Sequence, residues 1–497
     1  MSSIGSIGFD NDKYLVTQSM YINKRIEEFG GKLYLEFGGK LFDDHHAARV
    51  LPGFRPDSKV RMLMTLADKA EIVITINAND IEINKIRSDV GISYDSDVLR
   101  LIDAFREIGL YVGSVCITQY SDQPNAEAFA RRLESMGIKA YFHYIIPGYP
   151  TNVPLVVSDK GYGKNQYIET TRPLVIVTAP GACSGKMATC LSQLYHENLR
   201  GIRAGFAKFE TFPIWDLPLR HPVNLAYEAA TAESNDVNMI DPYHLDAYGE
   251  TAVNYNRDIE IFPVLTAIFE EIYGSCPYKS PTDMGVNMTG RCITDNDIVI
   301  EASRNEIIRR YYKISCDNKR SIAPDWAVNK IWYIMKQAKV TPDDRKVAVA
   351  ALEKSEETLT PATAIELVSG EIVTGKTSSL LGASSAALLN ALKLLGNIDD
   401  SVELISPTII EPIQKLKTGP MGNRNPRLHT DEVLIALSIC AVTDKTAETA
   451  INQLHKLKNC EAHSTVILSE VDNNVFRKLG VNLTSEPIYQ GKRLYRK

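Results

Sequence analysis

The sequence predicts an α/β protein: a parallel sheet of P-loop or Rossmann-like type covered by helices, followed by a smaller α/β C-terminal domain. Between residues 32 and 180, apolar runs alternate with amphipathic helical segments, which is the order of a parallel sheet with crossover helices. The runs are apolar almost throughout, as strands that are buried on both faces must be. A loop that contains glycine and lysine follows one of these strands directly.

The predicted elements can be placed in order along the chain. Helices at 96–109 and 125–137 carry apolar residues at helical spacing and end at a glycine. Further helices are predicted at 258–274, twice within 321–357, at 383–396 and twice within 430–459. The predicted strands occupy 32–37, 71–77, 111–120, 139–146, 153–159, 173–180 and 203–213, with two more at 464–473 and 486–489.

The length of the chain predicts more than one domain. With 497 residues it exceeds what a single hydrophobic core usually supports. Changes in the pattern of elements predict a P-loop-like α/β domain over 1–225 and a C-terminal α/β domain over 326–497. The stretch between them, 226–325, is predicted to be a mixed helical region that binds substrate or links the two domains.

Composition narrows the class of function. A net charge of −6 gives no electrostatic reason to expect nucleic acid, and no apolar run is long enough to span a membrane. The N-terminus lacks the pattern of a signal peptide, and the eight cysteines form no CxxC pair, so we expect a cytoplasmic protein. The expected partner is a small molecule that contains phosphate, bound by a homo-oligomer, with neither nucleic acid nor membrane involved.

The stretch TAPGACSGKMATC (178–190) is the first candidate for a phosphate-binding loop. A strand precedes it and a helix follows, so the helix would direct its positive end at an anion. It departs from GxxxxGK[ST], because Pro180 replaces the first glycine and Met187 replaces the hydroxyl residue that ligates Mg²⁺. An ordinary β–α turn without a ligand is the alternative. The residues predicted to bind the cofactor are Gly181, Ser184, Gly185, Lys186 and Thr189.

A second stretch, GEIVTGKT (370–377), matches GxxxxGK[ST] at every position. Alternating apolar residues on both sides of Ser369-Gly370 predict a β-hairpin here, with the residues between the two glycines in its second strand. The next helix begins only near 383, so the context argues against a P-loop. Lys376 and Thr377, followed by Ser378, stay as a second candidate site for an anion.

Several blocks of sequence resemble one bacterial family. They are 37–63, VTAPGACSGKMATCLSQLYHE (177–197), KFETFPIW (208–215) and TGKTSSLLGASSAALLNALK (374–393). Together they resemble an uncharacterised protein family of about 500 residues with a P-loop-like N-terminal part and a separate C-terminal domain. The resemblance covers the whole chain and implies the fold more than any chemistry. Where other members are expected to carry glycine, this chain has Ala182 or Cys183.

Acidic residues that follow apolar runs are candidates to hold Mg²⁺ or to act as a base. Asp80, Asp159 and Asp241 each stand after such a run, where the carboxyl edge of a sheet is expected. Asp241 is favoured because His244 and Asp246 follow it closely; a helix cap is the alternative for each. The predicted catalytic residues are Asp241, Lys186 and Asp159, and no metal ligands are assigned.

Polar side chains after the first and later strands are the predicted substrate contacts. Lysine and arginine here would bind a phosphorylated or acidic molecule, and a solvated loop with local ion pairs is the alternative. The predicted contacts are Lys40, Asp44, His45, Arg49, Arg55, Glu210 and Arg220, with Lys376 and Thr377 of the second loop. A Gly- and Pro-rich segment at 417–429 is predicted to be either a lid over phosphate or a linker; its polar residues are Lys417, Arg424, Arg427 and His429.

Together these features predict a nucleotide-dependent enzyme, a phosphotransferase or ligase that uses ATP or another nucleotide with Mg²⁺. A non-catalytic protein that binds a phosphorylated metabolite through a degenerate loop is the alternative, and Met187 favours it. A dinucleotide-dependent oxidoreductase is disfavoured because no GxGxxG follows the early strands.

Overall fold

The computed structural model describes residues 6–39, 41–87, 91–234 and 236–491. The chain folds into two compact units, each considered by itself below. The N-terminal unit comprises Ile7–Tyr227 and Asp236–Val299, and the C-terminal unit is built mainly from residues 300–491. Helices α9 (Pro222–Ala230) and α13 (Asn296–Lys319) contain the division points. Among the described residues, no helix combines the length and the apolar character that crossing a bilayer would require.

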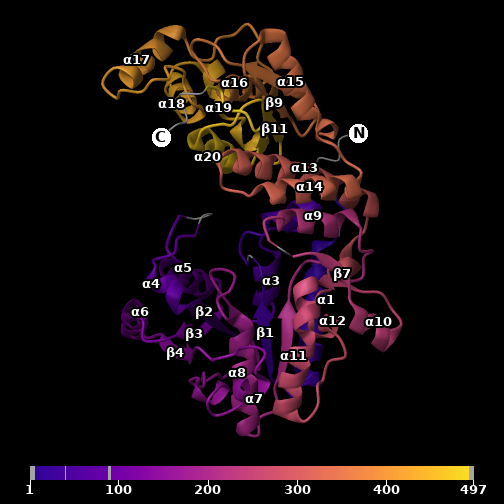
Figure 1. Ribbon diagram of the computed structural model, residues 1–497. Coiled ribbons are helices and arrows are strands. Elements are labelled where there is room, and N and C mark those ends of the chain that lie inside the picture. The colour runs from indigo at the N-terminus through magenta and orange to yellow at the C-terminus, as the bar shows by residue number, and fades with distance from the viewer. Residues whose placement is uncertain (1–5, 40, 88–90, 235, 492–497) are drawn as a thin grey trace. The chain divides into compact units, whose positions relative to one another are not determined.

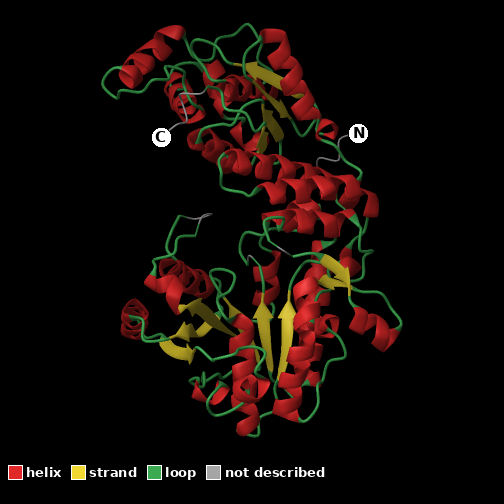
Figure 2. Cartoon of the chain, viewed as in Figure 1, coloured by secondary structure: helices red, strands yellow, loops and turns green. Residues whose placement is uncertain are grey.

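The N-terminal unit is built on a six-stranded sheet in the order β4-β3-β2-β5-β1-β6, with every neighbouring pair parallel (Figures 1 and 2). This confirms the predicted parallel α/β class. A two-stranded antiparallel sheet of β7 (Asn238–Ile240) and β8 (Val253–Tyr255) lies outside it. The six strands are β1 (Leu33–Phe37), β2 (Ala70–Asn77), β3 (Tyr111–Tyr120), β4 (Lys139–Tyr144), β5 (Leu174–Thr178) and β6 (Gly205–Phe209).

Helices cover both faces of this sheet, because successive residues of β1 and β5 are all buried. One face carries Val73, Val175, Val177 and Phe206, which pack in a single cluster with apolar residues of α8 and α11. The helices of this unit are α1 (Asn11–Glu28), α2 (His45–Val50), α3 (Ser58–Met64), α4 (Ala78–Glu82), α5 (Tyr94–Glu107), α6 (Pro124–Ser135), α7 (Val153–Val156), α8 (Lys186–Leu199), α10 (Pro242–Tyr248), α11 (Asn256–Tyr273) and α12 (Pro281–Met284), with 3-10 turns at Tyr162–Lys164 and Gly290–Cys292.

The predicted strand at 153–159 is wrong, since this segment forms the short helix α7. Pro154 in the first turn suits a helix start, because proline has no N–H group to leave unpaired there. The apolar run VPLVV is also too short for periodicity to distinguish a strand from a buried helical turn.

The C-terminal unit is the smaller α/β region that the sequence predicts, with a four-stranded mixed sheet in the order β10-β9-β11-β12. Its strands are β9 (Ala362–Glu366), β10 (Ile372–Lys376), β11 (Glu461–Ser464) and β12 (Asn482–Ser485). Besides part of α13, its helices are α14 (Asp325–Ala338), α15 (Lys346–Thr358), α16 (Ala383–Leu395), α17 (Pro407–Thr418), α18 (Thr430–Cys440), α19 (Lys445–Ile451) and α20 (Glu470–Lys478), with 3-10 turns at Pro342–Asp344 and Leu454–Leu457.

Two predictions for the last strands need correction. Only the first residue of the strand predicted at 464–473 is in a strand, because β11 covers Glu461–Ser464. Helix α20 then begins at Glu470, where the Ser469 hydroxyl accepts a hydrogen bond from the N–H of Asp472. The final strand is β12, four residues earlier than the predicted 486–489. The run of apolar residues 466–468 belongs to the connection between these elements and is buried there.

A buried ionic network ties the helices of the C-terminal unit to its sheet. Arg345, only 4% exposed, pairs with Glu461 at 2.8 Å and donates to the Thr484 hydroxyl at 2.9 Å and to the Ala462 carbonyl at 3.0 Å. Glu461 also pairs with Arg309 at 2.6 Å. These contacts join α13, the start of α15 and strands β11 and β12.

Replacement of Arg345 by leucine should lower the free energy of unfolding by about 2–3 kcal/mol, because Glu461 loses one of its two arginine partners and the Ala462 and Asn482 carbonyls each lose a donor inside the protein. Urea denaturation followed by circular dichroism measures the change. Arg477→Leu, at an exposed position on α20, is the control and should shift stability by no more than about 0.5 kcal/mol. A cost for Arg345→Leu as small as that of the control would contradict the structural role given to this network.

Candidate functional site

The loop of residues 179–185 lies at the centre of the carboxyl edge of the six-stranded sheet. It connects β5, which pairs with β1 on one side and β2 on the other, directly to α8. The predicted order of strand, loop and helix is therefore confirmed. In open α/β sheets ligands bind at this edge, where strand ends and helix starts meet.

Two residues of the loop have left-handed backbone conformations, Cys183 with φ 58° and Gly185 with φ 80°. The Ser184 hydroxyl donates to the carbonyl of Gly181 at 2.9 Å, and the Thr118 hydroxyl donates to the carbonyl of Ser184 at 2.9 Å. A Cβ atom on Gly185 would come within 2.9 Å of that Thr118 hydroxyl. The loop thus needs glycine here and is held in shape by its own contacts.

The main-chain N–H groups of residues 181–188 are the chief feature of this loop. Within the described parts of the chain, none of the eight donates to a protein acceptor; the first helical bond runs from Thr189 N–H to Gly185. Consecutive N–H groups in a turn that opens a helix form a concave site for an anion. The positive end of the α8 dipole falls at the same place.

Glu36 of β1 lies beside the start of α8. Its cross-strand partner is Lys208 of β6, so both side chains lie on the sheet face that α8 covers. Glu36 is 8% exposed, and one of its carboxylate oxygens has no hydrogen-bond partner among the described residues. Burial raises the pKa of Glu36, and the charges of Lys208 and Lys186 oppose that rise.

Lys208 connects this buried carboxylate to two others. Its ammonium lies 2.6 Å from Asp258, in the first turn of α11, and 3.3 Å from Glu210, just after β6. Burial alone would lower the pKa of Lys208, but the surrounding carboxylates raise it overall, so the ammonium stays charged.

Glu210 has a pKa suited to proton transfer near neutral pH. Burial raises the pKa of Glu210 to about 7; the Lys208 charge opposes this rise, whereas Asp258 and Glu36 add to it. Its side chain nevertheless keeps 31% of its surface exposed, so a ligand can reach the carboxyl group. A Cβ atom on Gly38 would lie 3.0 Å from Glu210, so the glycine turn after β1 leaves room for this side chain.

Other predicted members of the phosphate site have structural contacts. Thr189 is fully buried, and its hydroxyl lies 3.8 Å from the sulfur of Cys116. The exposed Asp159 accepts a hydrogen bond from the hydroxyl of Tyr195, two turns further along α8 than Lys186. Asp159 and Thr189 are therefore not brought to the N–H groups of the loop.

Asp241 forms the cap of α10 after the small β7–β8 sheet. One of its oxygens accepts from the N–H groups of Tyr243 and His244, and the other accepts from Thr282. It is fully buried, and each oxygen has partners. Asp241 thus has the contacts of the helix cap that was the alternative prediction. It lies after β7 of the small sheet and not at the carboxyl edge of the large sheet.

The predicted substrate cluster after β1 divides into buried and exposed residues. Asp44 caps α2 and pairs with Lys59 at 2.7 Å; burial would raise the pKa of Asp44, but Lys59 lowers it overall. His45 is exposed at the start of α2, and Arg49, with its own partners, lies in its last turn. Arg55, exposed, pairs with Asp57 at 3.5 Å. Lys40 lies outside the described residues, and Arg220 is exposed before α9.

The GEIVTGKT stretch forms the predicted hairpin of β9 and β10. Gly375 faces α16 so closely that a Cβ atom there would lie 2.1 Å from the Ala387 nitrogen, which explains this glycine by packing. Since neighbouring residues of a strand point to opposite faces, Lys376 points away from α16. Near the end of α15, the hydrogen bond and charge of Lys354 lower the pKa of Glu357, and the charge of Lys376 adds a smaller effect. The side chains of Lys376 and Thr377 therefore point to opposite faces and do not bind the same phosphate group.

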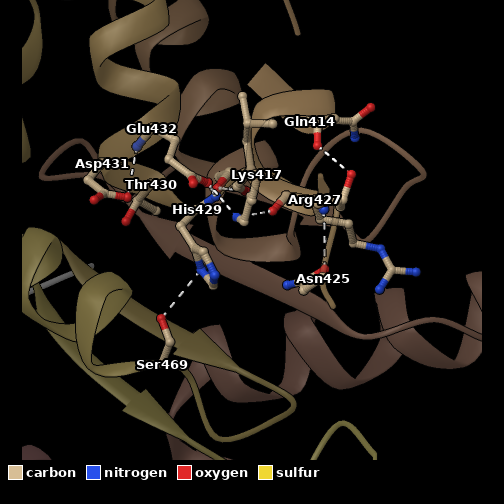
Figure 3. Close-up of polar contacts among 12 residues, drawn as sticks. Gln414, Lys417, Asn425, Arg427, His429, Thr430, Asp431, Glu432 and Ser469 are labelled. Carbon is tan, nitrogen blue, oxygen red and sulfur yellow. Dashed lines mark hydrogen bonds and ion pairs between the residues drawn. The ribbon is translucent and has the colours of Figure 1, made fainter. Parts of the chain in front are cut away.

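The predicted lid at 417–429 is partly built into the C-terminal unit, as Figure 3 shows. Lys417 at the end of α17 is 2% exposed, lies 2.6 Å from Glu432 and donates to the Arg427 carbonyl at 2.7 Å. His429 lies 3.0 Å from Asp472, which contributes to raising the pKa of His429. Arg424 is exposed.

Three residues of the candidate site were not found from the sequence: Glu36, Lys208 and Asp258. The available signal was a charged residue inside an apolar run, as in KLYLEF and GFAKFE. A charge buried in a central strand has to be paired or functional, because burying it otherwise costs several kcal/mol. Asp258 gave no such signal, since acidic residues are common in the first turn of a helix.

A hollow of about 700 Å³ lies at the opposite, amino edge of the sheet, beside the start of β4. Three of its charged side chains contact neighbours: Lys139 lies 2.6 Å from Glu169, and the Arg200 guanidinium stacks 3.7 Å above the Tyr167 ring. The unpaired N–H groups and the shifted carboxyl group are all at the carboxyl edge, which we take as the candidate site.

These features define a two-unit α/β protein whose candidate site is a turn with unpaired main-chain N–H groups at the carboxyl edge of a parallel sheet. The chain belongs to the DUF1846 family: the model described as domain of unknown function DUF1846, N-terminal, matches residues 7–339, and its C-terminal counterpart matches 343–495. This confirms the expected membership of an uncharacterised bacterial family of about 500 residues.

Relatives match along their entire length. The chain is 57% identical to the UPF0371 protein of Streptococcus pyogenes serotype M5 (strain Manfredo), over 99% of this chain and all of the relative. It is similarly 57% identical to the UPF0371 protein of Streptococcus uberis and 58% identical to that of Streptococcus sanguinis, each over 99% of both chains. These names state a family and no activity.

The raised pKa of Glu210 predicts a pH dependence of stability. The native state holds the proton more tightly than the unfolded chain, so native stability falls as pH rises from about 5 through 7. Glutamine at 210 cannot ionise and avoids this loss. The difference in unfolding free energy between Glu210→Gln and the natural chain should therefore move in favour of the variant between pH 5 and pH 8.

Urea denaturation at four pH values across this range measures that difference. Glu134→Gln, which removes an exposed carboxylate of α6, serves as the control and should show no comparable trend. If the difference in unfolding free energy between Glu210→Gln and the natural chain stays constant or moves the other way, the pKa of Glu210 is not raised. Glu210 would then not act as an acid or base near neutral pH.

Proposed function

We propose that the N-terminal unit is an enzyme that binds the phosphate groups of a nucleotide in the loop of residues 181–188. The observation that carries this proposal is the row of eight N–H groups with no protein acceptor in the described chain. Ala182 and Cys183 are exposed, but the other six residues of the row are buried or half-buried. N–H groups that are shielded from water need an acceptor, and phosphate oxygens supply several at once. The dipole of the fourteen-residue helix α8 adds to the attraction.

Lys186 supplies the positive side chain at this loop. It is the first residue of α8, and it forms no ion pair with any of the described residues. Its charge, together with that of Lys208, opposes the rise that burial causes in the pKa of Glu36. A lysine in this place acts as a point charge on phosphate oxygens.

The group of Lys208, Glu210 and Asp258 supports catalysis rather than binding alone. A carboxyl group with a pKa near 7 can take up a proton from an attacking hydroxyl and deliver it later. Glu210 is the member of this group that is exposed enough to reach a ligand. The function that fits best is a phosphotransferase or ligase that acts on a small acidic or phosphorylated acceptor, with Glu210 as its base.

Magnesium would accompany such a nucleotide, but few side chains near the loop could act as ligands for it. Met187 replaces the hydroxyl ligand and packs against the hydrophobic cluster under α8. The described residues contain no group of three or more acidic, histidine or cysteine side chains arranged to hold a metal. Mg²⁺ would then be held by the nucleotide phosphates and water, with Asp258 or Glu36 nearby.

Met187, which is partly buried and offers no hydroxyl to Mg²⁺, also favours a second candidate function, a protein that binds a phosphorylated metabolite without turnover. The two candidates differ in what Glu210 does. In an enzyme, Glu210→Gln keeps affinity and loses phosphate transfer; in a binding protein, the natural chain shows ligand binding that is independent of Mg²⁺ and no transfer at all.

The proposal predicts that Lys186→Ala weakens binding of ATP by about 10- to 100-fold, since one charge-assisted contact to phosphate is worth about 1.5–3 kcal/mol. Isothermal titration calorimetry with and without Mg²⁺ measures this. Lys160→Ala removes an exposed lysine from the same unit and should leave affinity unchanged.

Equal affinities for the natural chain and Lys186→Ala would contradict the proposed phosphate site. If the natural chain binds no nucleotide but binds a sugar phosphate, with the same loss in Lys186→Ala, the loop is a phosphate site and the nucleotide part of the proposal is wrong.

A further inference from the structure

We infer that the C-terminal unit contains a second anion site, at the amino end of α16, which takes a phosphate group of a small molecule. This site is independent of the loop at 181–188, because it is built entirely from residues of the other unit. Its components are the first N–H groups of α16, the hydroxyl of Thr377 and the guanidinium of Arg427.

The amino end of α16 is open. Its cap residue is Gly382, which has no side chain to accept a hydrogen bond, and the first helical bond is that of Ala386 N–H to Gly382. In the described chain, the N–H groups of Ala383, Ser384 and Ser385 donate to no protein acceptor. The helix has thirteen residues, so its dipole is developed.

Thr377 provides an independent sign of a missing partner. It is 8% exposed, and its hydroxyl has no hydrogen-bond partner among the described residues. A hydroxyl buried without a partner costs about 1–3 kcal/mol, so such groups usually serve a ligand or an ordered water.

The register of β10 directs this hydroxyl to the open helix end. Gly375 faces α16 at the level of Ala387. Thr377 follows the last residue of β10, and its N–H continues the pairing by donating to the Pro361 carbonyl, so it lies on the same face about 7 Å further on. Four residues back from Ala387, α16 reaches Ala383 after about 6 Å in the same direction. The chain between them turns back tightly, with Ser378 N–H bonded to the Leu381 carbonyl. Thr377 therefore lies opposite the first turn of α16.

Arg427 contributes the positive charge. Its Nε donates to the carbonyl of Ser378 at 2.8 Å, which fixes the side chain beside the turn that leads into α16. The next residue, Leu428, accepts from Gly382 N–H and from the Ser385 hydroxyl, so this segment runs along the start of the helix.

Figure 3 shows the guanidinium of Arg427 directed away from Lys417, whose charge is already matched by Glu432. In the described chain the remaining guanidinium N–H groups of Arg427 have no recorded acceptor. Three main-chain N–H groups, one hydroxyl and one guanidinium are the donor set that a tetrahedral phosphate group accepts from.

Hydrogen–deuterium exchange of the full-length chain tests this site locally, with inorganic phosphate as the probe. Without phosphate, the N–H groups at 383–385 exchange rapidly because nothing bonds to them. Phosphate should slow exchange in peptides that cover 380–386. Thr377→Val and Arg427→Gln should each raise the phosphate concentration needed for half-maximal protection by about tenfold.

Thr363→Val is the matched control. Thr363 is also fully buried with an unpartnered hydroxyl on the α16 face, but it lies opposite Gly375, one level deeper than Thr377. Its removal should leave phosphate protection unchanged. Far-ultraviolet circular dichroism of each variant checks folding, and Arg427→Gln keeps the test open if a threonine variant fails to fold.

The inference is overturned if phosphate gives the natural chain no protection at 380–386. It is also overturned if Thr377→Val and Arg427→Gln leave the midpoint unchanged, or if Thr363→Val shifts it as much as Thr377→Val does. Protection that survives in Lys186→Ala separates this site from the proposed nucleotide site.

Discussion

The unpaired N–H groups between Gly181 and Ala188 are the constraint on which the rest of the candidate site depends. The loop cannot satisfy them by folding on itself, because Thr118 and the Ser184 hydroxyl already hold it in its open shape. Gly185 is fixed in a left-handed conformation against Thr118, so the loop has little freedom to close. A site that is formed before the ligand arrives loses less entropy on binding.

The charges around this loop compensate one another closely. Lys208 is bonded to Asp258 and Glu210, and the charges of Lys208 and Lys186 both act on the buried Glu36. A phosphate group that enters adds negative charge beside Glu36 and Glu210, which favours their protonated forms. Under the proposed function, phosphate binding would raise the pKa of Glu210, which makes it a stronger base and lowers the fraction that is ionised at rest.

The sequence was sufficient for the architecture of the N-terminal unit. Strong apolar runs and glycine helix stops placed β1 to β5, α5 and α6 to within a few residues. Context also predicted the local structure of the two glycine–lysine stretches: β5 leads directly through a loop into α8, whereas the full motif match forms a hairpin. Short apolar runs failed at 153–159 and 464–473, since a few apolar residues fit a helix or a buried turn equally well.

The site residues were harder to predict, because they depend on neighbours far apart in sequence. Glu36 and Lys208 meet only through the pairing of β1 with β6, which no local pattern reveals. Asp241 and Thr189 have side chains suited to a nucleotide site, yet the fold uses them in a helix cap and in the core. Strand alternation alone would have separated Lys376 from Thr377 once the hairpin was assigned.

The measurement that tests the central claim most directly is a crystal structure of the protein with a non-hydrolysable ATP analogue. The account predicts phosphate oxygens within hydrogen-bond distance of N–H groups in the 181–188 loop, with the Lys186 ammonium on the outer phosphates and Glu210 facing the terminal one. An analogue bound at another place, with ordered water alone on those N–H groups, would contradict it.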